Sequence, residues 1–106
     1  DNAIVYKALK ENQVDIGMGF STDGRIQAFD LVNLADDLAF FPAYNPAPNL
    51  RADFATENPE IVKLLEKVAA KLDNDSIMQM NYLVDIEQKT PAEVAKNWLK
   101  SVGLIA

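Results

Sequence analysis

The sequence predicts an α/β domain in which a few strands precede three C-terminal helices. Two patterns support this class. Residues 14–20 alternate between apolar and small or acidic side chains, which is typical of a strand, and apolar residues recur at helical spacing from residue 58 onward. The resulting sheet would have only two or three strands, fewer than most stable sheets contain. We therefore expect that so thin a sheet needs a structural partner, and that this partner is missing here.

The first predicted element is an amphipathic helix over residues 2–12, whose apolar face comprises Ile4, Val5, Ala8 and Leu9. The strand follows at residues 14–20, and its apolar face comprises Val14, Ile16, Met18 and Phe20. Gly17 and Gly19 lie on the opposite face, which indicates that another backbone or a ligand approaches closely there. Residues 21–25 read Ser-Thr-Asp-Gly-Arg and predict a turn.

The middle of the chain is predicted to be extended. Residues 26–37 form a mostly extended segment with one change of phase, and residues 49–54 form one more short strand. Between them, residues 40–48 read FFPAYNPAP. Three prolines in nine positions exclude a continuous helix and a central strand, so this stretch is a stiff, irregular loop.

The C-terminal half is predicted to be helical. Asn58 is a good N-cap with Pro59 at the first helical position, and the apolar stripe that follows comprises Ile61, Leu64, Leu65, Val68 and Leu72. Asp75 or Ser76 caps the next helix, whose apolar residues are Ile77, Met80, Tyr82, Leu83 and Val84. Thr90 opens the last helix in a capping box with Glu93, and this helix carries Ala95, Trp98, Leu99 and Val102 and ends at Gly103.

Composition excludes several functions. The net charge of −6 and the pI of about 4.4 argue against nucleic acid as a partner, since such binding needs a basic surface. The chain has no Cys and no His, which excludes disulfides, thiol nucleophiles, Ser–His triads and Cys/His zinc sites. We expect no enzyme activity, no cofactor and no metal site. The first residues read as mid-domain sequence, so we expect a mature chain or a fragment.

Residues 19–26, GFSTDGRI, are the first candidate binding stretch. Phe20 ends the predicted strand, and Ser21, Thr22 and Asp23 follow it. Ligands of open α/β sheets bind at the carboxyl ends of strands, which favours a site here. The alternative is a purely local turn, in which Ser21 or Asp23 bonds the backbone and Arg25 pairs with a neighbouring acid.

Residues 40–48 are the second candidate. An aromatic ring on a proline-stiffened loop loses little entropy when it contacts a ligand, and aromatic faces attract quaternary ammonium cations. Tyr44 is equally consistent with such a wall and with a hydrophobic plug beneath the loop. For Phe40 and Phe41 we predict the plug beneath the loop.

Three stretches together resemble one bacterial family. They are YKALKENQVDIGMGFSTDGRI, FDLVNLADDLAFFPAYNPAP and MNYLVDIEQKTPAEVAKNWLK, and together they cover essentially the whole chain. They are similar to the C-terminal portion of the osmoprotectant, or quaternary-amine, substrate-binding proteins of ABC transporters, which bind glycine betaine, choline or carnitine. The joint occurrence of STDGRI and FFP-x-YN-x-AP at this spacing carries the resemblance.

The resemblance implies a fragment of a two-lobed type II periplasmic-binding-protein fold. Residues 1–33 would be the end of the second lobe and the return crossover, and residues 34–106 the C-terminal part of the first lobe. It also implies an extracytoplasmic location, at a membrane reached through an anchor or permease outside this chain, and an ABC permease subunit as partner. For an isolated piece, a homodimer or domain swap through its exposed sheet edge is an alternative.

The resemblance further implies an aromatic cage for the cation at the interlobe cleft. Phe20 and Tyr44 match two of its positions. The family usually has Tyr at the first, and Phe20 keeps the π-face but lacks the hydroxyl. Ser21, Thr22 and Asp23 are expected to lie at the cleft, contacting the ligand or closing the lobes. The alternative function is a structural module that self-associates and has no ligand of its own.

Overall fold

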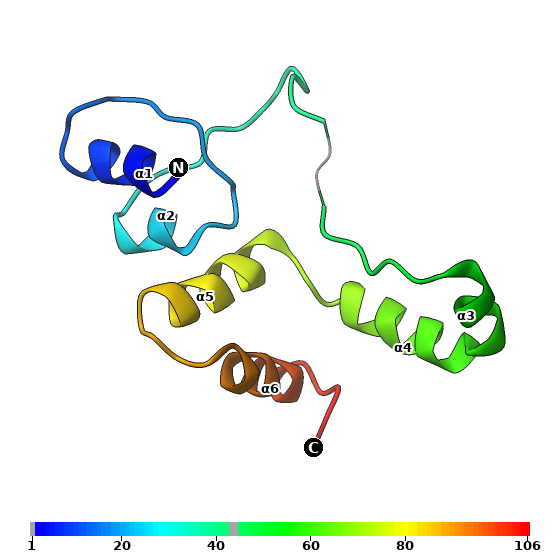
Figure 1. The fold of residues 1–106 in the computed structure, drawn as a ribbon. Helices are drawn as coiled ribbons and strands as arrows, with labels where there is room; N and C mark the ends of the chain where they lie inside the picture. The colour runs from blue at the N-terminus through cyan, green and yellow to red at the C-terminus, as the bar shows by residue number, and fades with distance from the viewer. Residues whose placement is uncertain (1, 43–44) are drawn as a thin grey trace. The chain divides into compact units, whose positions relative to one another are not determined.

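The structure, a computed structural model, describes residues 2–42 and 45–106. The helices in this part of the chain are α1 (Asn2–Lys10), α2 (Gly24–Ala28), α3 (Ala52–Glu57), α4 (Pro59–Ala69), α5 (Asn74–Asp85) and α6 (Pro91–Ser101) (Figure 1). Long irregular connections join α1 to α2 and, in its described residues, α2 to α3. None of the helices found in the described residues is long and apolar enough to span a membrane.

The predicted α/β class is wrong, because residues 2–42 and 45–106 contain helices and connections but no strand. Residues 14–20 run without regular structure, and the apolar side chains of Val14, Ile16 and Met18 are exposed. A strand exists only where a neighbouring backbone completes its ladder of hydrogen bonds. No described segment supplies that ladder to residues 14–20, so their alternating pattern has nothing to pair with.

The two other segments predicted as extended also contain helices. Residues 24–28 form α2 because Asp23 accepts a hydrogen bond from the backbone N–H of Arg25 and so starts a helical turn. Residues 52–57 form α3, where Asp53 lies in the first turn, favourably placed for the helix dipole. In both cases local interactions at the helix N-terminus favour a helix more strongly than the weak apolar pattern favours a strand.

The first helix and the three C-terminal helices were predicted correctly. Pro59 stands at the start of α4, next to its N-cap Asn58. The predicted cap of α5 is wrong, because Asp73 fills that place: its carboxylate accepts from the backbone N–H of Ser76 at 2.7 Å, and the Ser76 hydroxyl accepts from the backbone N–H of Asp73 at 3.1 Å. This reciprocal box lowers the pKa of Asp73.

Both ends of α6 follow the prediction. The Thr90 hydroxyl accepts from the backbone N–H of Glu93 at 3.3 Å. At the other end, Gly103 adopts the left-handed conformation with φ of 73°. Its N–H donates to the carbonyl of Lys100 at 3.0 Å, and the N–H of Leu104 donates to that of Leu99 at 2.9 Å. These two bonds form a Schellman motif, which explains why a glycine ends this helix.

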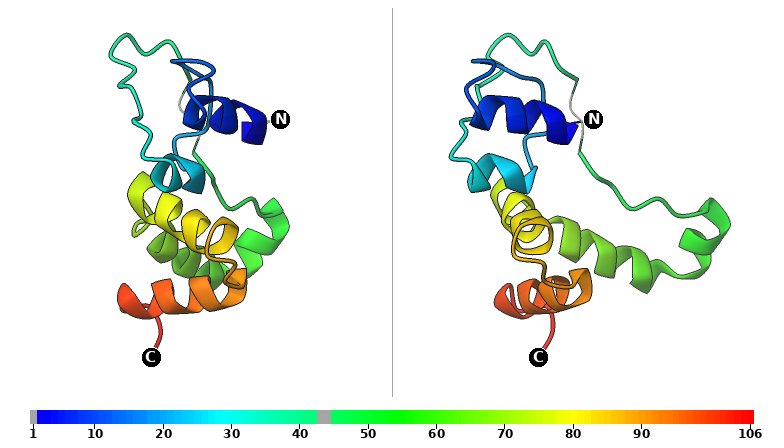
Figure 2. Two further views of the ribbon diagram at one scale, coloured as in Figure 1. Left: turned by 90° about the vertical axis from the view of Figure 1, so that its left-hand side faces the viewer. Right: turned by 60° about the vertical axis from the view of Figure 1, so that its left-hand side comes forward.

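The chain divides into two compact units. The first unit combines Asp1–Leu34 with Asp73–Ala106, and in it α5 lies between α2 and α6 (Figures 1 and 2). The buried apolar side chains of the described residues all belong to this unit: Tyr6, Ile26 and Val94. Gly24 lets α2 approach α5, because a Cβ at this position would stand 2.5 Å from the backbone nitrogen of Tyr82.

The second unit, Ala35–Leu72, contains α3 and α4, which pack on each other. The side-chain amide of Asn58 donates to the carbonyl of Phe54 at 2.9 Å, so it closes the end of α3 while its residue begins α4. None of the described apolar side chains in this unit is fully buried. Local hydrogen bonds, more than a core, organise this part of the chain.

Candidate functional site

The loop of residues 20–23 is held by contacts from distant parts of the first unit. At its start, the hydroxyl of Tyr6 on α1 bonds to both sides of the Phe20 residue. It accepts from the Phe20 backbone N–H at 2.9 Å and donates to the Phe20 carbonyl at 3.2 Å. The same carbonyl also accepts from the backbone N–H of Asp23 at 3.0 Å, which closes the turn. The backbone of Phe20 therefore has every polar group paired.

Two asparagine side chains hold the next two carbonyl groups. Asn33, beyond α2, donates to the carbonyl of Ser21 at 3.1 Å, and Asn81 on α5 donates to the carbonyl of Thr22 at 2.7 Å. The hydroxyl groups of Ser21 and Thr22 make no hydrogen bond to any residue that the structure describes. The backbone is thus fixed, while the two hydroxyl groups are free to meet another molecule.

Asp23 is engaged within its own turn. Its carboxylate accepts from the backbone N–H of Arg25 at 2.9 Å and pairs with the Arg25 guanidinium at 3.1 Å. The Asp23 side chain is only 13% exposed, so the contact is partly shielded from water. The local turn that the sequence offered as an alternative is therefore present: Asp23 caps α2 and pairs with Arg25.

Tyr6 is the residue of this site that the sequence pattern did not reveal. It is 3% exposed, and this burial raises the pKa of its phenol, although the hydrogen bond to Phe20 opposes the shift. Gly19 contacts the phenol oxygen so closely that a Cβ there would overlap it. The glycines at 17 and 19 do mark a close approach, but by side chains of α1: Val5 and Leu9 at Gly17, and Tyr6 at Gly19.

The side chain of Phe20 faces outward from this rigid loop, since Phe20 is 56% exposed while its backbone groups are all bonded. A ring presented in this way is preorganised: a ligand that contacts it need not order the loop first. An exposed aromatic face suits an apolar group or a cation. The first candidate stretch thus combines a fixed ring with two free hydroxyl groups.

The second candidate stretch is organised differently. Tyr44 lies outside the described residues. The predicted burial of its neighbours is wrong, since Phe40 is 82% and Phe41 51% exposed; the two rings meet edge to face with centroids 5.0 Å apart. Asp36 accepts from the backbone N–H of Phe40 at 2.9 Å and of Phe41 at 2.8 Å. The carboxylate thereby stabilises the turn that carries both rings, and both rings are exposed.

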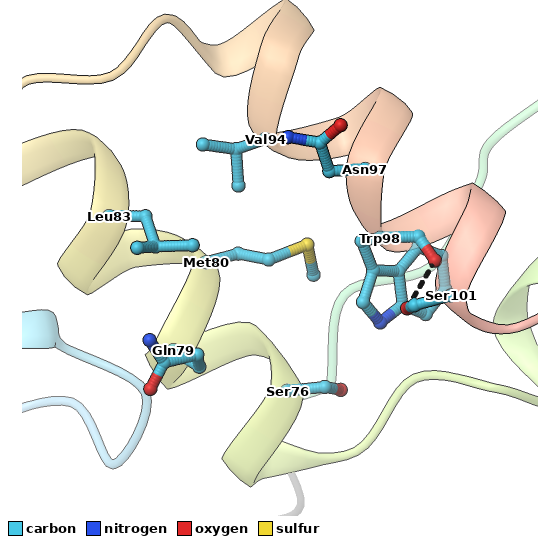
Figure 3. A pocket seen from close by; sticks show the side chains of 8 residues that line it. All are labelled: Ser76, Gln79, Met80, Leu83, Val94, Asn97, Trp98 and Ser101. Carbon is cyan, nitrogen blue, oxygen red and sulfur yellow. Dashed lines mark hydrogen bonds between the residues drawn. The ribbon is translucent and has the colours of Figure 1, made fainter.

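A groove of about 310 Å³ lies between α5 and α6 (Figure 3). The residues that line it are Ser76, Gln79, Met80, Leu83, Val94, Asn97, Trp98 and Ser101. Trp98 is the one aromatic ring among them, and none carries a charge. None of Phe20, Ser21, Thr22 and Asp23 contributes to it. The groove follows the seam between two packed helices and is separate from the candidate site.

The described residues contain no group of three or more His, Cys, Asp or Glu side chains placed to hold a metal ion. The first candidate stretch offers an aromatic ring and hydroxyl groups, and its carboxylate is occupied by Arg25. Such a set can bind a small organic molecule, but it has no nucleophile paired with a base. Its chemistry is that of a binding site.

The chain belongs to the family of substrate-binding domains of ABC-type glycine betaine transport systems, whose match covers residues 2–101. The resemblance seen in the sequence is therefore confirmed. This family consists of substrate-binding domains of a transport system, so the prediction that the chain is not an enzyme is also confirmed.

Two relatives and one solved structure show the extent of the similarity. The glycine-betaine-binding protein of Pseudomonas aeruginosa is 40% identical over 105 residues, 99% of this chain and 34% of that protein. The carnitine transport binding protein OpuCC of Listeria monocytogenes is 35% identical over 97 residues, 92% of this chain and 32% of that protein. The crystal structure of a glycine betaine/carnitine/choline ABC transporter matches with a TM-score of 0.86 and 36% identity, over 93% of this chain and 36% of that one. The chain thus spans about a third of the length of these relatives.

Proposed function

We propose that the chain is the C-terminal portion of a two-lobed binding protein that captures quaternary ammonium osmoprotectants for an ABC importer. The observation that carries this proposal is the family match over residues 2–101, combined with the exposed Phe20 ring on a fixed backbone. Relatives named for glycine betaine and carnitine support the ligand class, since both ligands carry a quaternary ammonium group.

The proposed mechanism is capture of the cation in an aromatic cage at the cleft between the lobes. Phe20 and Tyr44 each present one wall, and each ring contributes ~0.5–2 kcal/mol when the cation is desolvated. Ser21 and Thr22 offer their free hydroxyl groups to the ligand. Asp23 is paired with Arg25, so the role of Asp23 is to stabilise the conformation of the loop while the lobes close.

In the complete protein, residues 1–33 would end the second lobe and make the return crossover, and residues 34–106 would belong to the first lobe. This assignment rests on the resemblance, and the compact units follow a different division, because Asp1–Leu34 forms one unit with Asp73–Ala106. The partner would be the permease subunit at the outer face of the membrane, in the periplasm or on the cell surface, reached through an anchor or the permease itself.

Calorimetric titration tests this proposal. Glycine betaine, choline and carnitine are titrated into the complete two-lobed protein and its Tyr44→Ala variant. We expect binding by the wild type and a loss of tenfold or more in the variant, about 1.4 kcal/mol or above. Affinity should persist at high salt, because contacts with ring faces are screened less than contacts between surface charges. Absence of binding for all three compounds would contradict the proposed ligand class.

A second function, self-association without a ligand, is favoured by one observation. The exposed side chains of Val14, Ile16 and Met18 lie on a segment that has no ladder partner among the described residues. An unpaired segment of this kind can pair with a second copy. Sedimentation of the 106-residue chain tests it: a dimer that dissociates on replacing Ile16 with Lys supports it, and a monomer at all concentrations contradicts it.

A further inference from the structure

One hydroxyl group controls the backbone of Phe20. The Tyr6 phenol accepts from the N–H of Phe20 and donates to its carbonyl, so it touches both peptide groups that flank the Cα carrying the ring. These bonds join residues 14 positions apart. A side chain leaves its Cα in a direction set by the backbone, within a few rotamers. Fixing both peptide groups therefore limits where the Phe20 ring can point.

We propose that Tyr6 is a positioning residue for the aromatic wall: it holds the Phe20 ring at the place where a quaternary ammonium group binds. This inference rests on the proposed function, because it requires Phe20 to contact the ligand. Tyr6 itself is 3% exposed and meets no ligand; it acts only through Phe20.

Gly19 makes this contact possible. The phenol oxygen and the ring carbon that bears it both lie where a Cβ of residue 19 would be, so only glycine leaves room for the hydroxyl to reach Phe20. The φ angle of Gly19 lies outside the left-handed region, and alanine could adopt the same backbone conformation. The requirement for glycine at this position is therefore steric, and the three atoms nearest to such a Cβ all belong to Tyr6.

The protonation of the phenol matters as well. A single hydroxyl can donate to one group and accept from another only while it keeps its proton. Burial raises the pKa of Tyr6 above its ordinary value, so the group stays protonated at physiological pH. Both bonds to Phe20 are thus available under the conditions in which the protein works.

A double-mutant cycle on the complete two-lobed protein tests the inference, with choline as the probe. Tyr6→Phe removes the hydroxyl and keeps the ring, and we expect it to raise the Kd for choline about tenfold, the size of one lost hydrogen-bonding group. Phe20→Ala removes the wall. In the Phe20→Ala background, Tyr6→Phe should change the Kd by less than about twofold, because the ring that it positions is gone.

Gly19→Ala provides a second route to the same result, and also serves if Tyr6→Phe does not fold. Its Cβ displaces the phenol while residues 6 and 20 keep their chemistry, so the Kd should rise by about the same factor. Tyr82→Phe is the matched control. The Tyr82 hydroxyl makes no hydrogen bond to a described residue, and its removal should leave the Kd unchanged.

The outcomes separate this inference from the function on which it rests. An equal rise of the Kd with and without Phe20 would overturn the positioning role, since Tyr6 would then act on the protein as a whole. No rise from either Tyr6→Phe or Gly19→Ala would overturn it too. If Phe20→Ala alone leaves the Kd unchanged, the proposed binding site is contradicted. If the wild-type protein binds no choline, the proposed ligand class is contradicted. In either case the positioning role of Tyr6 is contradicted as well, because it requires Phe20 to contact the ligand.

Discussion

The two aromatic stretches of the chain hold their rings by opposite means. In the loop of residues 20–23, the backbone is bonded to Tyr6, Asn33 and Asn81, side chains that the chain brings back from distant positions. In residues 36–41, the carboxylate of Asp36 alone bonds to the backbone of Phe40 and Phe41, four and five residues away. The loop of residues 20–23 therefore depends on the tertiary structure, whereas the turn in residues 36–41 is stabilised by hydrogen bonds within that segment.

This difference shows how an aromatic ring can be held in place without being buried. A ring becomes preorganised when its backbone is held from outside the loop, as at Phe20. Phe40 and Phe41 are fixed only relative to each other and to Asp36, all within one short segment. Changes in the packing of the first unit should therefore reach Phe20 and leave the turn at Asp36 intact.

The largest effect is expected from Gly24→Ala. The new Cβ would stand 2.5 Å from the backbone nitrogen and 2.6 Å from the Cα of Tyr82, atoms that cannot rotate away. We expect a loss of about 3 kcal/mol in the free energy of unfolding, measured by denaturant titration of the complete protein. Gly17→Ala is the control: its nearest atom is also at 2.5 Å but belongs to the Val5 side chain, so the loss should be about 0.5–1.5 kcal/mol. Equal losses would contradict the close packing of α2 on α5.

Asn81→Ala should have the next largest effect. It leaves the partly buried carbonyl of Thr22 without its donor, which costs about 1–2 kcal/mol. Asn33→Ala breaks an exposed bond that water can replace, and it should change the free energy of unfolding by less than about 0.5 kcal/mol. Denaturant titration measures both. A reversed order would show that the support of this loop does not come from α5.

A smaller, pH-dependent loss is expected from Tyr6. Its pKa is raised in the folded protein, so the unfolded chain ionises first as the pH rises past the ordinary value of 10.0. The stability that Tyr6 contributes is therefore complete below pH 10.0 and declines above it. The denaturant midpoint of the wild type should fall more steeply above this pH than that of Tyr6→Phe. Parallel curves would contradict a buried, hydrogen-bonded phenol.

Asp36→Ala should have the smallest effect on stability, because its hydrogen bonds are exposed and local. The denaturant midpoint should not move. In NMR spectra, the amide signals of Phe40 and Phe41 should shift while that of Phe20 stays in place. A shift at Phe20 would show that the two stretches are coupled and would break the contrast between them.

Part of the structure of the candidate site could be predicted from the sequence. The STDGRI motif identified Phe20 and its turn, and the Asp23–Arg25 pair followed from ordinary turn chemistry. Tyr6 was missed because helical periodicity placed its neighbours Ile4 and Val5 on the apolar face, whereas Ile4 is in fact exposed. The one indication in the sequence was Gly19, which predicted that another group lies close to the backbone there but did not identify that group as Tyr6.

The sequence by itself determined the family and the positions of the C-terminal helices. These follow from local causes: motifs read in order, and caps such as Thr90 and Gly103 that lie within a turn of the helix they bound. The tertiary structure alone decided that residues 14–20 form no strand and that Phe20 is held by Tyr6. Both depend on which distant group meets a backbone N–H or carbonyl, and a local pattern does not contain that information.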